Sequence, residues 1–173
     1  MNPFPGNPPN GPYTSPYAYD PATAQTTKQG WRDRLVVLFI CLALFLIACV
    51  CPALTFRRSS GDVESWPGFQ TLMMGWLGLL FKQIAWYANP VIVLSLVFLL
   101  FRRWLAAMII ALVAFAMAAN TLLLFSRDLP ADEGNVIKLR LDHLSPGFYF
   151  WIASIVTVII GAIILRRRET AAV

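Results

Sequence analysis

Apolar residues are concentrated in four long runs along the chain, and most polar residues fall between them. The first run contains 22 residues without a charge and ends just before Arg57. A helix of about 20 residues crosses the roughly 30 Å hydrocarbon core of a bilayer. The pattern therefore predicts an all-α integral membrane protein with four transmembrane helices, at residues 35–56, 84–101, 104–125 and 146–165.

The region that leads into the second span is less regular. Apolar residues run from 71 to 101 but are interrupted by Lys82, Gln83 and the pair Asn89-Pro90. One straight helix over this region would be about 47 Å long, more than a bilayer accommodates without strong tilt. We therefore expect a short interfacial or re-entrant helix over 71–83, then the second span with a kink near Pro90. A single long second span is the alternative.

The connections between the later spans also carry signals. Only Arg102 and Arg103 separate the second span from the third, so these two helices are expected to be antiparallel neighbours. Ser145 as N-cap and Pro146 as first helical residue mark the start of the fourth span. In the connection before it, apolar and charged residues alternate over 136–142, a period-two pattern that a short strand would also give. We expect an irregular loop whose leucines lie on the membrane surface, and a short strand is the alternative.

The first 30 residues differ from the rest, because they are rich in Pro, Asn and Tyr and contain no Leu, Ile or Val. Such a segment cannot bury enough apolar surface to offset its ordering entropy, so we expect a disordered cytoplasmic tail. Its tyrosines, Tyr13, Tyr17 and Tyr19, are candidate contacts for a partner. The membrane domain is then 31–168, followed by a short cytoplasmic tail at 169–173.

Composition and charge support a membrane protein and suggest its orientation. The chain is 58% hydrophobic and 13% charged, whereas soluble domains carry about 25% charged residues. Its net charge of +5 comes from arginine clusters at the ends of apolar runs, which argues against nucleic acid as a partner. With both termini in the cytoplasm, that side holds 8 basic and 3 acidic residues and the other side holds 6 of each. Arg57 and Arg58 on the outer side oppose this arrangement. Small size and compact loops favour a multi-pass protein of a bacterial cytoplasmic (inner) membrane.

Small residues form stripes at helical spacing on several segments. A small face lets a neighbouring helix approach closely, so these stripes predict packing surfaces. The stripes of the third and fourth spans are expected to pack against each other. The three sets are Thr71, Gly75, Gly78 and Lys82; Ala107, Ala111, Ala114, Ala118 and Thr121; and Ala153, Thr157 and Gly161.

Three polar residues in apolar surroundings are the candidate intramembrane positions: Lys82, Asn89 and Asn120. The two asparagines fall at similar depth on neighbouring antiparallel helices, so we expect them to bond directly or to share one bound polar group. Hydrogen bonding between helices is the structural interpretation, and a site for an ion or lipid headgroup is the functional one. Lys82 is expected to reach water from the interfacial helix.

No group of residues points to catalysis, a cofactor or a metal. Cys49 and Cys51 are two apart on an expected helix and would point in different directions, and the only histidine, His143, is far away in the sequence. Residues 46–49 resemble a bacterial lipobox, but the apolar run begins unusually late for a signal peptide. The acidic residues lie outside all four spans, so an intramembrane proton relay has no carboxylates. We therefore expect no catalytic, cofactor-binding or metal-binding residues.

These observations favour a non-catalytic interaction or assembly component of a membrane complex. Its expected partners are the lipid bilayer and other membrane-protein subunits or a second copy of the chain. The alternative is an oligomeric transporter or channel subunit with a polar path near Lys82, Asn89 and Asn120. One chain of four helices is small for a transport path, so this alternative requires oligomerisation.

Overall fold

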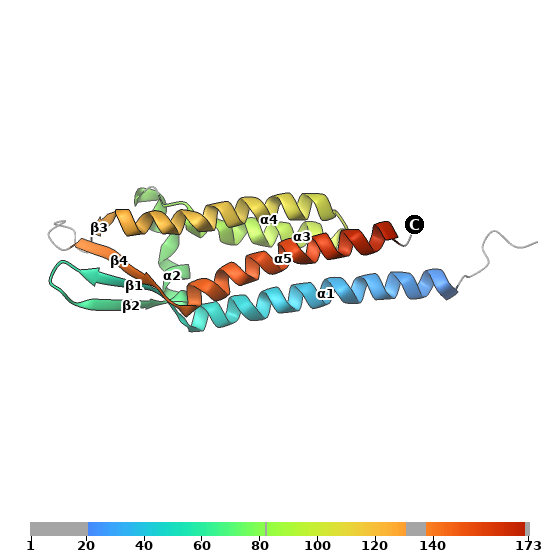
Figure 1. Ribbon diagram of the computed structural model, residues 1–173, viewed down its shortest axis with the longest axis horizontal. Coiled ribbons are helices and arrows are strands. Elements are labelled where there is room, and N and C mark those ends of the chain that lie inside the picture. The colour runs from blue at the N-terminus through green and yellow to red at the C-terminus, as the bar shows by residue number, and fades with distance from the viewer. Residues whose placement is uncertain (1–20, 82, 131–137, 172–173) are drawn as a thin grey trace, which may run out of the picture.

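A computed structural model describes residues 21–81, 83–130 and 138–171. Four helices run side by side along the molecule: α1 (Pro21–Val50), α3 (Ala88–Leu100), α4 (Trp104–Ala119) and α5 (Pro146–Ala171) (Figure 1). A 3-10 segment, η3 (Asn120–Ser126), continues α4. Helix α1 packs mainly against α5, α5 also packs against α4, and α4 packs against α3, so the order in space differs from the order in sequence.

Three helices within the described residues are long and apolar enough to cross a membrane: Gly30–Val50, Trp104–Ser126 and Pro146–Ala171. The helical segment at the predicted second span, Ala85–Leu100, is shorter, about 24 Å at 1.5 Å per residue. It begins with the 3-10 turn η2 (Ala85–Tyr87). The structure therefore supports a mostly helical protein of membrane type.

The expected first span, 35–56, is wrong at its second end, because the helix stops before residue 56. Helix α1 begins earlier, at Pro21, inside the segment expected to be disordered; the rest of that tail lies outside the described residues. The helix ends at Val50, and strand β1 (Pro52–Arg58) follows directly. Pro52 explains the end of the helix, because proline disfavours helical geometry in the residue before it and has no N–H for a helical hydrogen bond.

A small sheet corrects the prediction of an all-α protein. Its strands are β1, β2 (Val63–Pro67), β3 (Asp128–Pro130) and β4 (Lys138–Leu144), in the order β2-β1-β4-β3, and all pairs are antiparallel. Strand β4 contains most of the charged–apolar alternation seen in the sequence, so the expected irregular loop is wrong over 138–142 and the alternative, a short strand, is confirmed there. Residues 136–137 lie outside the described residues. Leu139 and Leu141 of this strand are buried, whereas Lys138, Arg140 and Asp142, which alternate with them, are exposed.

The inner face of the sheet has its own apolar core. Phe56 is its most buried member, and its ring lies 5.0 Å from that of Trp66. Leu54, Leu124, Leu139 and Leu141 complete this cluster, with Leu124 coming from η3. The sheet is thus fastened to one end of the helical bundle.

The bundle core is built on the alanine stripe of α4, as expected. Ala107, Ala111, Ala114 and Ala118 are all 0% exposed, and α3 and α5 pack on either side. Without side chains beyond Cβ, α4 lets both neighbours come close, and Ser95 of α3 donates to the backbone oxygen of Ala107 at 2.6 Å.

The small stripe of α5 has a different partner from the one expected. A Cβ built on Gly161 would lie 2.5 Å from a methyl group of Val37, so this glycine permits the close approach of α1 rather than α4. The α5 face toward the bundle core carries larger residues, including Ile155 and Val158.

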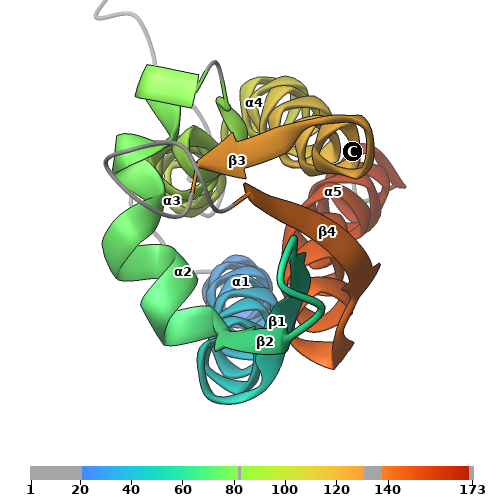
Figure 2. The same ribbon diagram turned by 90° about the vertical axis from the view of Figure 1, so that its left-hand side faces the viewer.

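The short helical segment expected before the second span is present, as α2 (Gly68–Met74) and the 3-10 turn η1 (Gly75–Phe81). It runs across the end of the bundle, from the sheet to the start of α3, and is not part of one long second helix (Figures 1 and 2). Phe69, Met73 and Trp76 lie on its outer face and are exposed.

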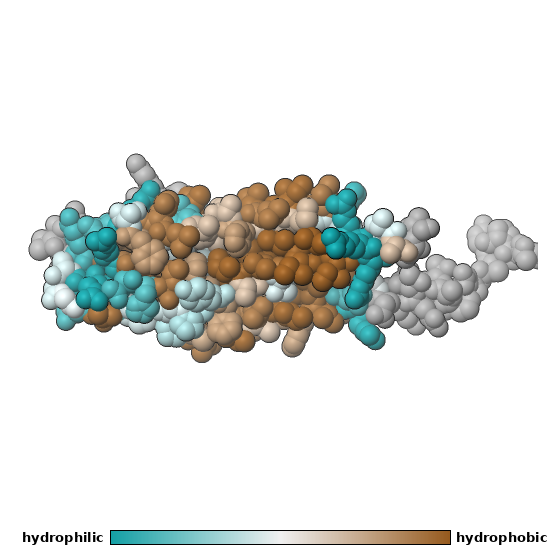
Figure 3. Space-filling model, viewed as in Figure 1, coloured by the Kyte–Doolittle hydropathy of each residue, from teal (hydrophilic) through white to brown (hydrophobic). Residues whose placement is uncertain are grey.

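Charged residues gather at the two ends of the molecule, with an apolar belt between them (Figure 3). The start of α1, the turn between α3 and α4 and the end of α5 meet at the end opposite the sheet (Figure 1). Arg168 bonds Asp33 at 2.6 Å, and Arg34 donates to the backbone oxygen of Leu100 at 2.5 Å. Arg102, in the left-handed conformation at φ +60°, pairs with Glu169. The start of α1 and the end of α5 therefore lie at the same end of the helical bundle.

Candidate functional site

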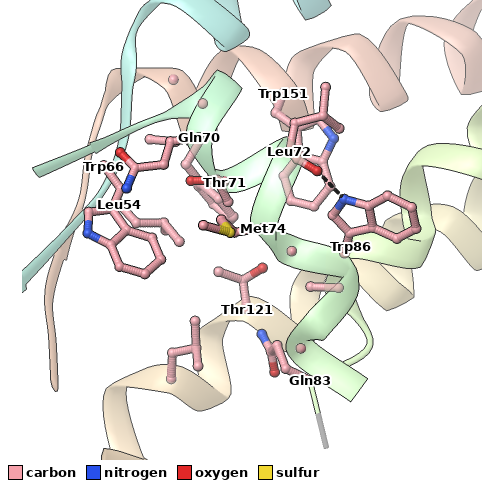
Figure 4. Close-up of a pocket in the computed structure, with 18 of the residues that line it drawn as sticks. Leu54, Trp66, Gln70, Thr71, Leu72, Met74, Gln83, Trp86, Thr121 and Trp151 are labelled. Carbon is pink, nitrogen blue, oxygen red and sulfur yellow. Dashed lines mark hydrogen bonds between the residues drawn. The ribbon is translucent and has the colours of Figure 1, made fainter. Parts of the chain in front are cut away.

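A cavity of about 370 Å³ lies where the sheet meets the helical bundle (Figure 4). Its volume is within the roughly 300–1,000 Å³ range of small-molecule sites in proteins. The walls come from the end of α1, the inner face of the sheet, α2 and η1, the start of α3, η3 and the first turn of α5. We take this cavity as the candidate functional site.

Aromatic and aliphatic side chains form most of the wall. Leu54, Phe56 and Leu139 line it from the sheet, and Phe148 and Trp151 line it from α5. Trp66 and Trp86 close it from β2 and η2, respectively. A wall of this kind favours an apolar occupant, because burial of apolar surface is worth about 25 cal/mol per Å².

The elements are held around the cavity by close backbone contact at Gly147. A Cβ built on this residue would lie 2.8 Å from the backbone oxygens of both Cys51 and Pro52. Only glycine lets the first turn of α5 approach the α1–β1 junction this closely. Nearby, Ser145 donates its backbone N–H to the oxygen of Ala53 at 3.0 Å, and its hydroxyl bonds that of Thr55 at 2.8 Å.

The polar groups in the wall are uncharged: none of the lining residues within the described chain is Asp, Glu, Lys, Arg or His. Trp86 donates its indole N–H to the backbone oxygen of Leu72 at 2.7 Å, which ties η2 to α2 (Figure 4). Trp151 donates to the side-chain oxygen of Asn89 at 2.9 Å, which ties α5 to α3. Gln70, Thr71, Gln83 and Thr121 also line it with polar side chains.

Gln83 is distinctive among the lining residues. Its amide nitrogen donates to the backbone oxygen of Asn120 at 3.3 Å, while its Oε1 is buried without a hydrogen-bond partner. Leaving such an acceptor unpaired costs about 1–3 kcal/mol. In this conformation the oxygen is covered, so a donor in the cavity would reach it only after the amide turns.

The three candidate positions from the sequence, Lys82, Asn89 and Asn120, do not come together in one site within the described residues. Asn89 lines the cavity, and Asn120 lies beside it, where its side-chain oxygen accepts from the backbone N–H of Ile84 at 3.0 Å. Lys82 lies outside the described residues. Instead of bonding directly to each other, the two asparagine side chains bond to Trp151, for Asn89, and to Ile84, for Asn120. A polar group shared by the two asparagines stays a prediction.

Sequence reasoning missed the residues that build most of the wall. Gln83 was visible as a polar residue in an apolar region, but it was considered only as the end of a short helix. Trp66, Trp86 and Trp151 come from three separate elements, and their sequence positions give no sign that they surround one cavity.

The cysteines and the charged groups of the sheet do not form a reactive centre in the described residues. Cys41 is buried, Cys49 lines the cavity, and no group of three His, Cys, Asp or Glu residues in the described ranges could hold a metal ion. On the sheet surface, Asp142 bonds His143 at 3.1 Å and Arg57 at 3.0 Å. Hydrogen bonds from His143 and Arg57 lower the pKa of the Asp142 carboxyl, which forms an ion pair with Arg57 on the sheet surface.

A comparison of the chain with protein-family models, with curated proteins and with solved structures gives no match. The functional argument therefore rests on the residues of this chain and their arrangement.

Proposed function

We propose that the protein is a multi-pass protein of the cytoplasmic (inner) membrane of a bacterium, with four spans and both termini in the cytoplasm. Antiparallel packing of Ala85–Leu100 against α4 supports its assignment as the second span despite its length, which brings the number of spans to four. The arginine-rich end, where α1 starts and α5 ends, is then cytoplasmic by the positive-inside tendency. The sheet, α2 and the cavity are placed at the outer surface.

In this position the protein is a non-catalytic binding component of the membrane, and the cavity holds an apolar molecule drawn from the outer leaflet. The observation that carries this proposal is the aromatic and aliphatic wall with few, uncharged polar groups. General acid–base and nucleophilic catalysis require titratable or activated groups at the reacting atoms, whereas binding of an apolar molecule requires only shape and apolar surface.

The position of α2 supports supply from the membrane. This segment exposes Phe69 and Met73 of α2 and Trp76 of the following η1, which would lie at the headgroup level, where amphipathic segments bury an apolar face. Its other side lines the cavity through residues such as Thr71. The segment is thus a thin wall between the outer leaflet and the bound molecule.

The transporter or channel alternative is less well supported. Asn89 contributes to the cavity wall, but the bundle core next to it is filled by side chains such as Leu99, Ile155 and Val158, each 0% exposed. A polar path would have to run between copies of the chain.

Native mass spectrometry of the purified full chain tests the proposed function. We expect wild-type protein to retain a bound apolar molecule, identifiable after solvent extraction. Thr121→Phe, which places a ring in the cavity from a buried position, is expected to remove most of it. Thr157→Phe is the matched control, since Thr157 of α5 does not line the cavity. Equal retention by a folded Thr121→Phe variant, or no retained molecule in wild-type protein, would contradict the proposal.

A further inference from the structure

A second hollow, of about 550 Å³, lies at the opposite end of the molecule, between the first turns of α4 and the last turns of α5. Trp104 and Met108 line it from α4, and Ala162, Ile163, Arg166 and Arg167 line it from α5. This groove is separate from the cavity beneath the sheet and shares no lining residue with it.

The groove has two chemical zones along the helix axis. Met108, Ala162 and Ile163 make an apolar floor on the side of the membrane belt. Arg166 and Arg167 lie four residues beyond that floor on α5, or about 6 Å along the axis, at the polar end. A phospholipid has the same order of groups, since its phosphate lies at the interface and its acyl chain lies below it.

The hydrogen bonds at this end leave the two groove arginines available. Arg34, Arg102 and Arg168 are engaged by the oxygen of Leu100, by Glu169 and by Asp33. Glu169, the acidic residue adjacent to the groove, is held by Arg102 and by the indole N–H of Trp104.

Within the described residues, Arg166 and Arg167 are exposed and have no side-chain hydrogen bond or ion pair to a protein acceptor. The polar end of the groove therefore carries positive charge that nearby carboxylates do not neutralise.

We propose that this groove binds an anionic phospholipid, with its phosphate at Arg166 and Arg167 and one acyl chain along the floor. Guanidinium groups bind phosphate oxygens in bidentate geometry, and basic pockets between transmembrane helices are suited to anionic headgroups. The occupant is a lipid of the leaflet that surrounds the arginine-rich end. A free anion would contact only the arginines and would leave the apolar floor unoccupied.

The test compares phosphatidylglycerol with phosphatidylcholine of identical acyl chains, titrated onto the full chain in detergent and measured by native mass spectrometry. Wild-type protein is expected to bind phosphatidylglycerol more tightly, by roughly fivefold for each arginine that contacts the phosphate. Arg166→Gln/Arg167→Gln is expected to lose this preference. Arg32→Gln/Arg103→Gln removes the same charge from exposed positions that do not line the groove, and it is expected to keep the preference.

Three results would overturn the proposal. Equal binding of the two lipids to wild-type protein would show that the headgroup charge is not recognised. Equal losses in the two double variants would show that only net charge matters. Displacement of phosphatidylglycerol by millimolar inorganic phosphate would identify the groove as a site for a free anion.

Discussion

Trp151 of α5 donates its indole N–H to Oδ1 of Asn89 in α3, across 2.9 Å. The two residues are 62 positions apart and both line the cavity. Helices α3 and α5 otherwise have little contact, since α4 packs between them over most of the bundle. This hydrogen bond therefore fastens the start of α3 to the start of α5 at the place where the cavity needs a wall.

A double-mutant cycle on this pair should show coupling. Asn89→Ala and Trp151→Phe each remove one partner, and hydrogen bonds between membrane helices are worth about 0.6 to 2 kcal/mol. We expect each variant to destabilise the protein, and the double variant to cost less than the sum of the two. Denaturant melts in detergent measure these free energies of unfolding. Asn89→Ala combined with Asn120→Ala is the control and should be additive, because these residues have separate partners.

The alanine stripe should be intolerant of added volume. Ala111 is 0% exposed, so Ala111→Leu would force a larger side chain between α4 and its neighbours. We expect a loss of about 1–3 kcal/mol in the free energy of unfolding. Ala116→Leu is the control, because Ala116 lies on the exposed side of α4 and a leucine there does not press against a neighbouring helix. If Ala116→Leu were as destabilising as Ala111→Leu, the packing of the stripe would not be the cause.

The sheet should weaken in acid through Glu64. Hydrogen bonds from Arg58 and Trp66 lower the pKa of this carboxyl below its ordinary value of 4.5. A carboxyl with a lowered pKa in the folded state stabilises the protein above its unfolded pKa, and this contribution is lost as the pH falls through the folded pKa.

Trp66 fluorescence or hydrogen exchange of the β1–β2 hairpin should therefore report loosening below about pH 4.5. Glu64→Gln should flatten this dependence while lowering stability at neutral pH. A hairpin with the same acid response in both proteins would rule out Glu64 as its source.

The proposed orientation predicts opposite accessibility at the two ends. Alkaline phosphatase, active only outside the cytoplasm, should be inactive when fused to Val173. A cysteine introduced by Ser60→Cys, in the turn between β1 and β2, should react with a membrane-impermeant maleimide on intact cells. The reverse pattern would invert the topology and place the sheet in the cytoplasm.

Local periodicity was enough to predict the α4 stripe, since all residues that define it lie on one continuous helix. The same reasoning failed at β1, because Ala53, Leu54 and Phe56 are apolar and extend the hydrophobic run of α1. A buried strand that directly follows a membrane helix has the same high hydropathy as the helix, so hydropathy alone does not show where the helix ends. What makes these residues a strand is pairing on both sides. The neighbouring β2 lies on one side, and on the other is β4, whose residues come more than 80 positions later: Phe56 pairs with Leu141 and Arg57 with Arg140.

The cavity could not be predicted from the sequence for a related reason. Its wall combines residues from the sheet, α2, η3 and the starts of α3 and α5, and each is unremarkable within its own segment. Asn89 was identified because a polar side chain in an apolar run stands out. Its true partner, Trp151, did not stand out among the four consecutive aromatic residues at 148–151.

The pairing of the first helix with the last also sets an order of folding. Helices α3 and α4 are joined by a tight turn, so their contacts are local and can form as soon as both are inserted. Strand β1 must wait for β4, and α1 for α5, because β4 and α5 are synthesised after α3 and α4. Until then β1 has only the short hairpin partner β2, and the cavity has no far wall. The cavity is thus completed only after β4 and the start of α5 have been made, and a chain truncated before residue 138 would contain α1, α3 and α4 without ever forming it.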